Sequence, residues 1–309
     1  MSTAARASDL GGAPTHVGRF VTPIARWSSR LALFFVSLLL VTLVLHRLGS
    51  LPTVLTLNLF AVGYVGSALA LAIGLVALAR IWRTGEGGAG NLAIGILLPL
   101  VALAGPAAFL IASHDLPRIN DVTTDLVNPP QFKLLAPREK EANPSSYPGA
   151  EVAALQAGAY PDLRTLVLAR SVDDAFELVE EVAKRLRWRV TVAEVRTGRP
   201  PAKTAVMEAT DHTLLVGFPD DIVVRIEGSN ALSRIDIRSA SRYGKFDFGQ
   251  NAARLRRFLA DVALRAEATG PSSGAGRGLR NARARALLKR QKARDQQKAA
   301  PRPARGRGQ

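Results

Sequence analysis

The sequence of 309 residues contains no cysteine. This absence excludes disulfide bonds, thiolate metal sites and cysteine nucleophiles, and it leaves the redox compartment of the protein undetermined. Histidine is also scarce, because the four histidines lie at positions 16, 46, 114 and 212 and show no spacing that suits a metal site. We therefore expect neither a metal ion nor a cofactor.

Charged residues are missing from three long apolar runs in the first third of the chain. The runs are Leu31–Leu45, Leu51–Ala79 and Leu92–Ser113. A helix of roughly 20 residues crosses a bilayer core about 30 Å thick, so the runs predict transmembrane helices at about 27–48, 53–80 and 92–113. Ionisable residues inside a membrane mark ion and proton pathways, and their absence here argues against a transporter or pump.

The rest of the chain has the length of one globular domain and a basic tail. We predict a cytoplasmic segment at 1–25, a membrane module at 26–113, a soluble domain at 114–268 and a disordered tail at 269–309. The formal net charge is +16, and residues 271–309 contain twelve Lys or Arg and one Asp, so the tail carries +11. Such a tail suits anionic lipid or wall polymer, and it suits nucleic acid only if it lies in the cytoplasm.

Basic residues close to the membrane spans predict the orientation of the protein. Five of them favour one side and three the other: Arg19, Arg26, Arg30, Arg80 and Arg83 against Arg47, Arg118 and Lys133. This margin predicts a cytoplasmic amino terminus and a periplasmic soluble domain. In a bacterium with an Ala- and Arg-rich composition like this one, the protein is then a multi-pass protein of the inner membrane.

Small residues recur every four positions in the second apolar run, at Gly66, Ala70 and Gly74. This spacing places them on one stripe of a helix, where helix backbones approach closely. We expect the stripe to pack against the neighbouring helices of the same chain rather than against a second copy. The oligomeric state stays open.

The soluble part begins with proline-rich sequence between Pro117 and Pro161, which predicts an extended strap on the domain surface. Apolar residues at helical spacing then predict a helix after Ser171, capped by Ser171 and Asp174, and a final helix that starts near Asn251 as its cap. Alternating patterns predict strands at Trp188–Val195, Thr204–Ala209, Thr213–Phe218, Ile222–Glu227 and Ser233–Ser239. Turns are expected at Pro219–Asp221 and Gly228–Asn230. The fold class is α+β, a three-helix transmembrane module followed by an antiparallel sheet with two packed helices.

Three separated passages of the soluble part resemble the family called domain of unknown function 1499. They are Ile119–Asp125, Gly217–Arg225 and Arg238–Asn251, in the order of the family. The resemblance covers roughly residues 115 to 268. It implies a bacterial, often membrane-attached protein, and it implies no established activity.

The passage between the last strand and the last helix offers a candidate anion site. Arginine side chains near the N–H groups of a helix amino terminus bind phosphate or carboxylate. The candidate residues are Arg238, Ser239, Ser241, Arg242, Lys245 and Asn251. A structural interpretation competes with this one, in which Asp236 pairs with Arg225, Asp247 pairs with Arg242, and the glycines simply allow a tight loop.

Two functions therefore remain open. The first is a membrane-anchored envelope protein that is not an enzyme and whose soluble domain binds an anionic ligand, such as a lipid headgroup or a wall fragment, or a protein partner. The second is an enzyme acting on an envelope substrate. Its acid or base would be one of four carboxylates, Asp121, Asp125, Asp220 or Asp247. An enzyme of this kind needs a carboxylate with a displaced pKa in a cleft.

Overall fold

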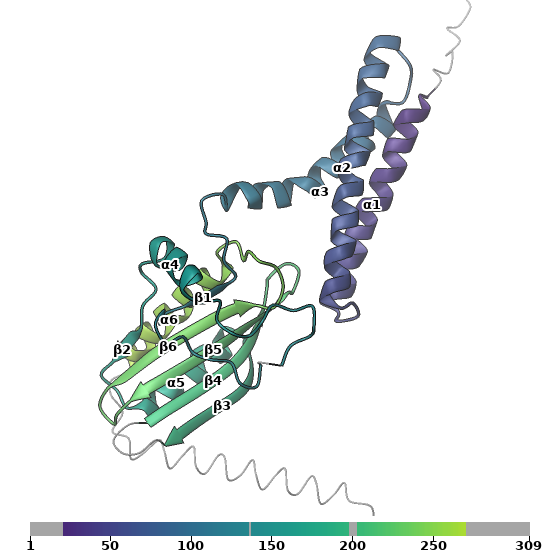
Figure 1. The fold of residues 1–309 in the computed structure, drawn as a ribbon. Helices are drawn as coiled ribbons and strands as arrows, with labels where there is room; N and C mark the ends of the chain where they lie inside the picture. The colour runs from purple at the N-terminus through teal and green to yellow at the C-terminus, as the bar shows by residue number, and fades with distance from the viewer. Residues whose placement is uncertain (1–20, 136, 198–202, 270–309) are drawn as a thin grey trace, which may run out of the picture. The chain divides into compact units, whose positions relative to one another are not determined.

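The computed structural model describes residues 21–135, 137–197 and 203–269 (Figure 1). The chain divides into two compact units. The first contains the three amino-terminal helices, and the second is an α+β domain that the chain enters at Leu116. The predicted tail lies outside the described residues.

The first unit consists of α1 (Pro23–Arg47), α2 (Thr53–Thr84) and α3 (Ala89–Ala112). All three helices are long and apolar enough to cross a membrane, which confirms that the three apolar runs form long helices. Helix α2 ends at Gly85, which adopts the left-handed conformation that favours glycine at this position. The protein is therefore a chain with three candidate transmembrane helices and a separate α+β domain.

The stripe of small residues on α2 packs inside this unit. Gly66, Ala70 and Gly74 are buried, and a side chain at Gly66 would overlap the ring of Phe35 on α1. Ser28 of α1 donates a hydrogen bond of 2.9 Å to the carbonyl oxygen of Ala70. The expected packing between helices of the same chain is confirmed.

The α+β domain is built on one antiparallel sheet. Its strands are β1 (Asp121–Thr123), β2 (Leu166–Leu168), β3 (Arg189–Thr197), β4 (Lys203–His212), β5 (Pro219–Gly228) and β6 (Ser233–Ser241). The sheet order is β1-β6-β5-β4-β3, and β2 also pairs with β6. Strands β3 to β6 form a meander, and the two short strands share the remaining edge of β6.

Helices α4 (Ala150–Ala159), α5 (Val172–Arg185) and α6 (Gln250–Ala268) complete the domain. Helices α5 and α6 pack on one face of the sheet (Figure 1), where Trp188 stacks on Phe258 with ring centroids 5.0 Å apart. Ser171 caps α5 as predicted, because its hydroxyl accepts the backbone N–H of Asp174 at 3.1 Å. The α+β class with two helices packed on an antiparallel sheet is confirmed.

Residues 124–135 and 137–148, here called the strap, cover the opposite face of the sheet, here called the outer face. Phe132 and Leu135 of the strap pack with Val223 and Ala240 of the outer face. The strap was predicted from its prolines, but α4 was missed inside the same proline-rich region.

Three local predictions were wrong. Residues 213–218 form the loop that joins β4 to β5 rather than a strand. Residues Pro219–Asp221 are not a turn, since all three pair with β4. Asn251 does not cap α6, because that helix begins at Gln250 and Asp247 accepts the N–H groups of Gly249 and Asn251 instead.

Candidate functional site

Arg238 is the largest side chain that is fully buried in the domain. Its guanidinium group makes two hydrogen bonds to the carboxylate of Asp121, at 2.9 and 2.7 Å. It also donates to the carbonyl oxygens of Pro130 and Ser145 in the strap, at 3.2 and 3.0 Å. The rings of Phe132 and Tyr147 lie over it, with centroids at 4.8 and 5.3 Å. Arg238 therefore links the sheet to both halves of the strap.

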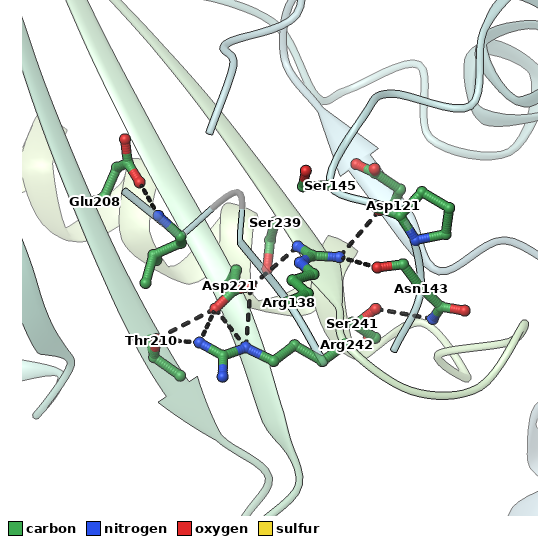
Figure 2. A network of polar contacts seen from close by, with 12 residues as sticks. Asp121, Arg138, Asn143, Ser145, Glu208, Thr210, Asp221, Ser239, Ser241 and Arg242 are labelled. Carbon is green, nitrogen blue, oxygen red and sulfur yellow. Dashed lines mark hydrogen bonds and ion pairs between the residues drawn. The ribbon is translucent and has the colours of Figure 1, made fainter. Parts of the chain in front are cut away.

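Asp221 is a second buried charge on the outer face. It lies between the guanidinium groups of Arg138 and Arg242 (Figure 2), at 3.0 and 2.8 Å. Arg138 comes from the strap and also donates to the carbonyl oxygens of Asn143 and Pro144, at 2.8 and 3.0 Å. Burial lowers the pKa of Arg138, and the carboxylate of Asp221 opposes this effect. One sheet carboxylate thus holds the second half of the strap.

Glu208 holds the first half of the strap. The residue is 1 % exposed, and its carboxylate accepts the backbone N–H groups of Lys133, Leu134 and Leu135 at 2.8 to 3.3 Å. Figure 2 shows Glu208 beside the strap, with one of these bonds drawn. Charge-assisted bonds of this kind are stronger than bonds between neutral groups. The side chain replaces the strand partner that these three amides would otherwise need.

The centre of the outer face has a third ion-pair group. Arg225 pairs with Asp125 of the strap at 2.8 Å and with Asp236 of β6 at 3.2 Å. Burial acts to raise the pKa of Asp125, but the N–H of Asn128 and the guanidinium of Arg225 outweigh it and lower that pKa. The pairing of Asp236 with Arg225 is confirmed, whereas the pairing of Asp247 with Arg242 was wrong, since Arg242 pairs with Asp221.

On the helix side, Asn251 collects the polar groups at the end of β6. It accepts the hydroxyl of Ser239 at 2.7 Å and donates to the hydroxyl of Ser241 at 3.1 Å. Arg254 of α6 bonds to Ser239 and Asn251 and pairs with Asp220 at 2.7 Å. These side chains fix α6 to the sheet.

Asp247 supplies the remaining support for α6. Burial raises its pKa, while the backbone N–H groups of Asn251 and Gly249 act in the opposite direction. A carboxylate at the first turn of a helix satisfies amides that have no partner within the helix. Asp247 is therefore a helix cap in this structure.

A cavity of about 230 Å³ opens at the end of the sheet where β1 and β6 meet. Two prolines of the strap and an alanine of β6 line part of it. The polar lining residues are Asn120, Asp121, Asn143, Ser146 and Ser241. Asn120 and Asn143 each donate to the carbonyl oxygen of Gly244, at 2.8 and 2.7 Å. The loop after β6 thus borders the cavity.

Two ionisable groups at or beside this cavity have shifted pKa values. Burial raises the pKa of Asp121, and the bidentate contact with Arg238 opposes the shift. Burial, with the nearby charge of Asp121, raises the pKa of Tyr147 to about 12. Tyr147 lies between the lining residues Ser146 and Pro148 in sequence. Asp121 is the candidate carboxylate that combines a cavity with a raised pKa.

The structure divides the predicted anion-site residues into three groups. Ser239, Ser241 and Asn251 share the network beneath the end of β6, while Arg238 lies on the outer face with its charge paired. Arg242 keeps 30 % of its side chain exposed, and Lys245 is exposed on the loop that borders the cavity. Only Ser241 of the six lines the cavity itself.

Sequence patterns did not predict the roles of Arg138, Glu208 and Arg254. One signal was available, because Glu208 sits within an alternating strand pattern at a position that is not at a strand end. A charged side chain in the middle of a strand that the strap covers is buried, so it needs a hydrogen-bonding or ion-pair partner. Arg138 and Arg254 carry no comparable signal, since one lies in irregular sequence and the other is an ordinary polar residue on a helix.

The residues that the structure describes contain no group of three His, Asp or Glu side chains arranged to hold a metal ion.

The family model described as "Protein of unknown function (DUF1499)" matches residues 121–262, from β1 into α6. This match confirms the resemblance drawn from the three sequence passages. No curated protein and no solved structure matches the chain.

Proposed function

We propose, on the premise that residues 121–262 form a DUF1499 domain, that the chain is a membrane-attached binding module. Its ligand is a small anionic group, taken at the cavity beside β1 and β6. The observations that carry the proposal are the cavity of about 230 Å³, which polar side chains line in part, and the exposed Lys245 in the loop after β6. Lys245 follows Gly244, which is hydrogen-bonded to two of the lining residues.

The size and lining of the cavity favour a compact polar ligand. Drug-sized ligands occupy largely apolar pockets of roughly 300–1,000 Å³. This cavity is smaller, and two amides, two hydroxyls and a carboxylate contribute to its lining beside two prolines and an alanine. A phosphate-bearing headgroup or a wall fragment of similar size has the hydrogen-bonding groups to match. The charge of the ligand would face Lys245 and the exposed part of Arg242.

The buried arginines of the outer face do not belong to the proposed ligand site, because their charges are already paired. Arg138, Arg225 and Arg238 each pair with a carboxylate of the same domain. A paired and buried cation has no charge left for a ligand, and separating the pair is costly. The ligand is therefore assigned to the cavity and its border rather than to Arg238.

A tryptophan at Ser146 tests this assignment. Ser146 is an exposed lining residue, so Ser146→Trp should fill the cavity without disturbing the core. We expect at least a tenfold loss of affinity for sn-glycerol 3-phosphate, measured by isothermal titration calorimetry on the full chain in nanodiscs. Lys245→Gln should weaken binding about two- to fivefold, as for an exposed charge pair worth up to about 1 kcal/mol.

The matched control is Asn230→Trp, because Asn230 is exposed in the turn at the opposite end of the sheet. This variant should bind the probe as the natural chain does. Equal affinities for Ser146→Trp and the natural chain would remove the cavity as the site. Glycerol binding as tightly as its phosphate would show that no anion is recognised.

The alternative function is acid–base catalysis at Asp121 on an envelope substrate. Asp121 lines the cavity and burial raises its pKa, as a general acid requires. All four candidates have structural partners, since Asp121 pairs with Arg238, Asp125 pairs with Arg225, Asp220 pairs with Arg254 and Asp247 caps α6. Asp121 differs from the other three because it also lines the cavity. Conversion of a phosphate-bearing probe into a product at the cavity would favour this alternative over the binding module.

We place the protein in the inner membrane with the domain in the periplasm, because basic residues near the predicted spans favour a cytoplasmic amino terminus. The basic tail would then meet anionic lipid, wall polymer or an envelope protein, and nucleic acid only in the reverse orientation.

The chain lacks cysteine, so Ser272→Cys provides a single site for an impermeant maleimide. Labelling of intact spheroplasts is expected, and labelling only after lysis would reverse the orientation.

A further inference from the structure

The loop between β4 and β5 carries two leucines that are almost completely exposed. Residues 213–218, here called the hairpin tip, read Thr-Leu-Leu-Val-Gly-Phe and contain no charge. Leu214 is 86 % exposed and Leu215 is 79 % exposed. Isolated exposed leucines are ordinary on protein surfaces, but two adjacent ones at the end of an uncharged hairpin make a compact apolar projection.

The shape of the hairpin tip does not depend on these leucines. Its two ends are joined by a hydrogen bond of 2.9 Å from the N–H of Thr213 to the carbonyl oxygen of Phe218. The hydroxyl of Thr213 accepts the N–H of Phe218, also at 2.9 Å. Gly217 takes a φ of 87°, which suits glycine in a tight loop. These hydrogen bonds and the glycine conformation involve neither leucine side chain.

The hairpin tip lies at the end of the sheet where the chain enters the domain. Arg242, directly after β6, donates its N–H to the carbonyl oxygen of Pro219, directly after the tip. The entering residue Asn120 accepts the N–H of Ser241 at 2.9 Å. In sequence, only a few residues separate this entry from the end of α3 at Ala112. The cavity opens at the same end of the sheet.

We infer that the hairpin tip inserts Leu214 and Leu215 into the interface of a lipid bilayer. Transfer of apolar side chains out of water is favourable. Two leucines would hold a free domain only weakly, but a covalent tether to membrane-spanning helices makes the insertion intramolecular and raises its effective concentration. The partner is lipid rather than protein, because the domain is tethered to three helices long and apolar enough to cross a membrane, which keep a bilayer within reach.

With the hairpin tip in the interface, the cavity at the same end of the sheet faces the headgroup layer. The insertion itself is independent of the proposed function, since its test requires no ligand. Failure of glycerol phosphate to bind would therefore leave the insertion standing, and failure of the insertion would leave the cavity assignment standing.

The test places an environment-sensitive fluorophore on the hairpin tip of the full chain in nanodiscs. Leu215→Cys, and Leu214→Cys as a second variant, provide single labelling sites in a chain without cysteine. The matched control is Ala231→Cys, exposed in the turn between β5 and β6 at the opposite end of the sheet. We expect lipids with a spin label near the headgroup to quench the tip fluorophore at least threefold more than the control.

Two outcomes overturn the inference. A tip fluorophore that is as open to water and as weakly quenched by lipid as the control shows that the tip stays in solvent. A tip fluorophore shielded from water but not quenched by lipid shows that a protein surface, such as a second copy, covers the leucines instead.

Discussion

Replacing Arg238 with methionine should lower the free energy of unfolding by about 3–5 kcal/mol, the usual cost of removing one partner of a buried ion pair. Arg238 is fully buried and makes two hydrogen bonds to Asp121. The substitution leaves that carboxylate buried without its partner, and it also leaves the carbonyl oxygens of Pro130 and Ser145 without their donor. Urea unfolding in mild detergent, followed by near-ultraviolet circular dichroism, measures the loss.

A double variant separates the ion pair from general damage to the core. Arg238→Met combined with Asp121→Asn removes both charges and should recover part of the stability, because no unpaired charge is left buried. The control is Arg256→Met, since Arg256 pairs with Asp162 at a largely exposed site and should lose no more than about 1 kcal/mol. Equal losses for Arg238→Met and Arg256→Met would contradict the structural role given to Arg238.

Replacing Asp221 with asparagine should have an effect of similar size, about 3–5 kcal/mol, for a related reason. Asp221 is fully buried and lies between Arg138 and Arg242 (Figure 2). Asparagine keeps the shape but removes the negative charge, so two neighbouring guanidinium groups lose the carboxylate that separates them. The strap should detach from the sheet around Arg138.

Hydrogen exchange of the strap amides measures this detachment. In Asp221→Asn, exchange of residues 137–144 should accelerate more than exchange of residues 133–135, whose amides bond to Glu208. Asp173→Asn is the matched control, because Asp173 pairs with Lys203 and is 54 % exposed. A uniform acceleration across the domain would indicate global destabilisation rather than release of the strap.

Much of the architecture follows from periodic patterns in the sequence. The three spans, α5 with its Ser171 cap and most strands were predicted because each depends on local hydrophobic spacing. The loop at 213–218 was mistaken for a strand for the same reason, since its apolar residues look like a buried strand although Leu214 and Leu215 are exposed. Pattern alone does not distinguish burial in a core from exposure at a hairpin tip.

The candidate site was harder to predict because its geometry depends on contacts between distant residues. Arg238 and Asp121 are 117 positions apart, and no spacing rule connects them. The arginines near α6 suggested an anion site, but the sheet and the strap supply carboxylates for them. Asp220 and Asp221 suggested a turn because of their chemistry, whereas in the fold they are the partners of Arg254 and Arg138. The charge pairs across the outer face could be assigned only from the register of the strands.

Hydrogen exchange of the full chain with and without sn-glycerol 3-phosphate tests binding at the cavity most directly. We predict slower exchange in two segments when the probe is present, residues 143–148 of the strap and residues 242–246 after β6. These segments line or border the cavity. Unchanged exchange in both segments, or protection confined to another part of the domain, would contradict the assignment.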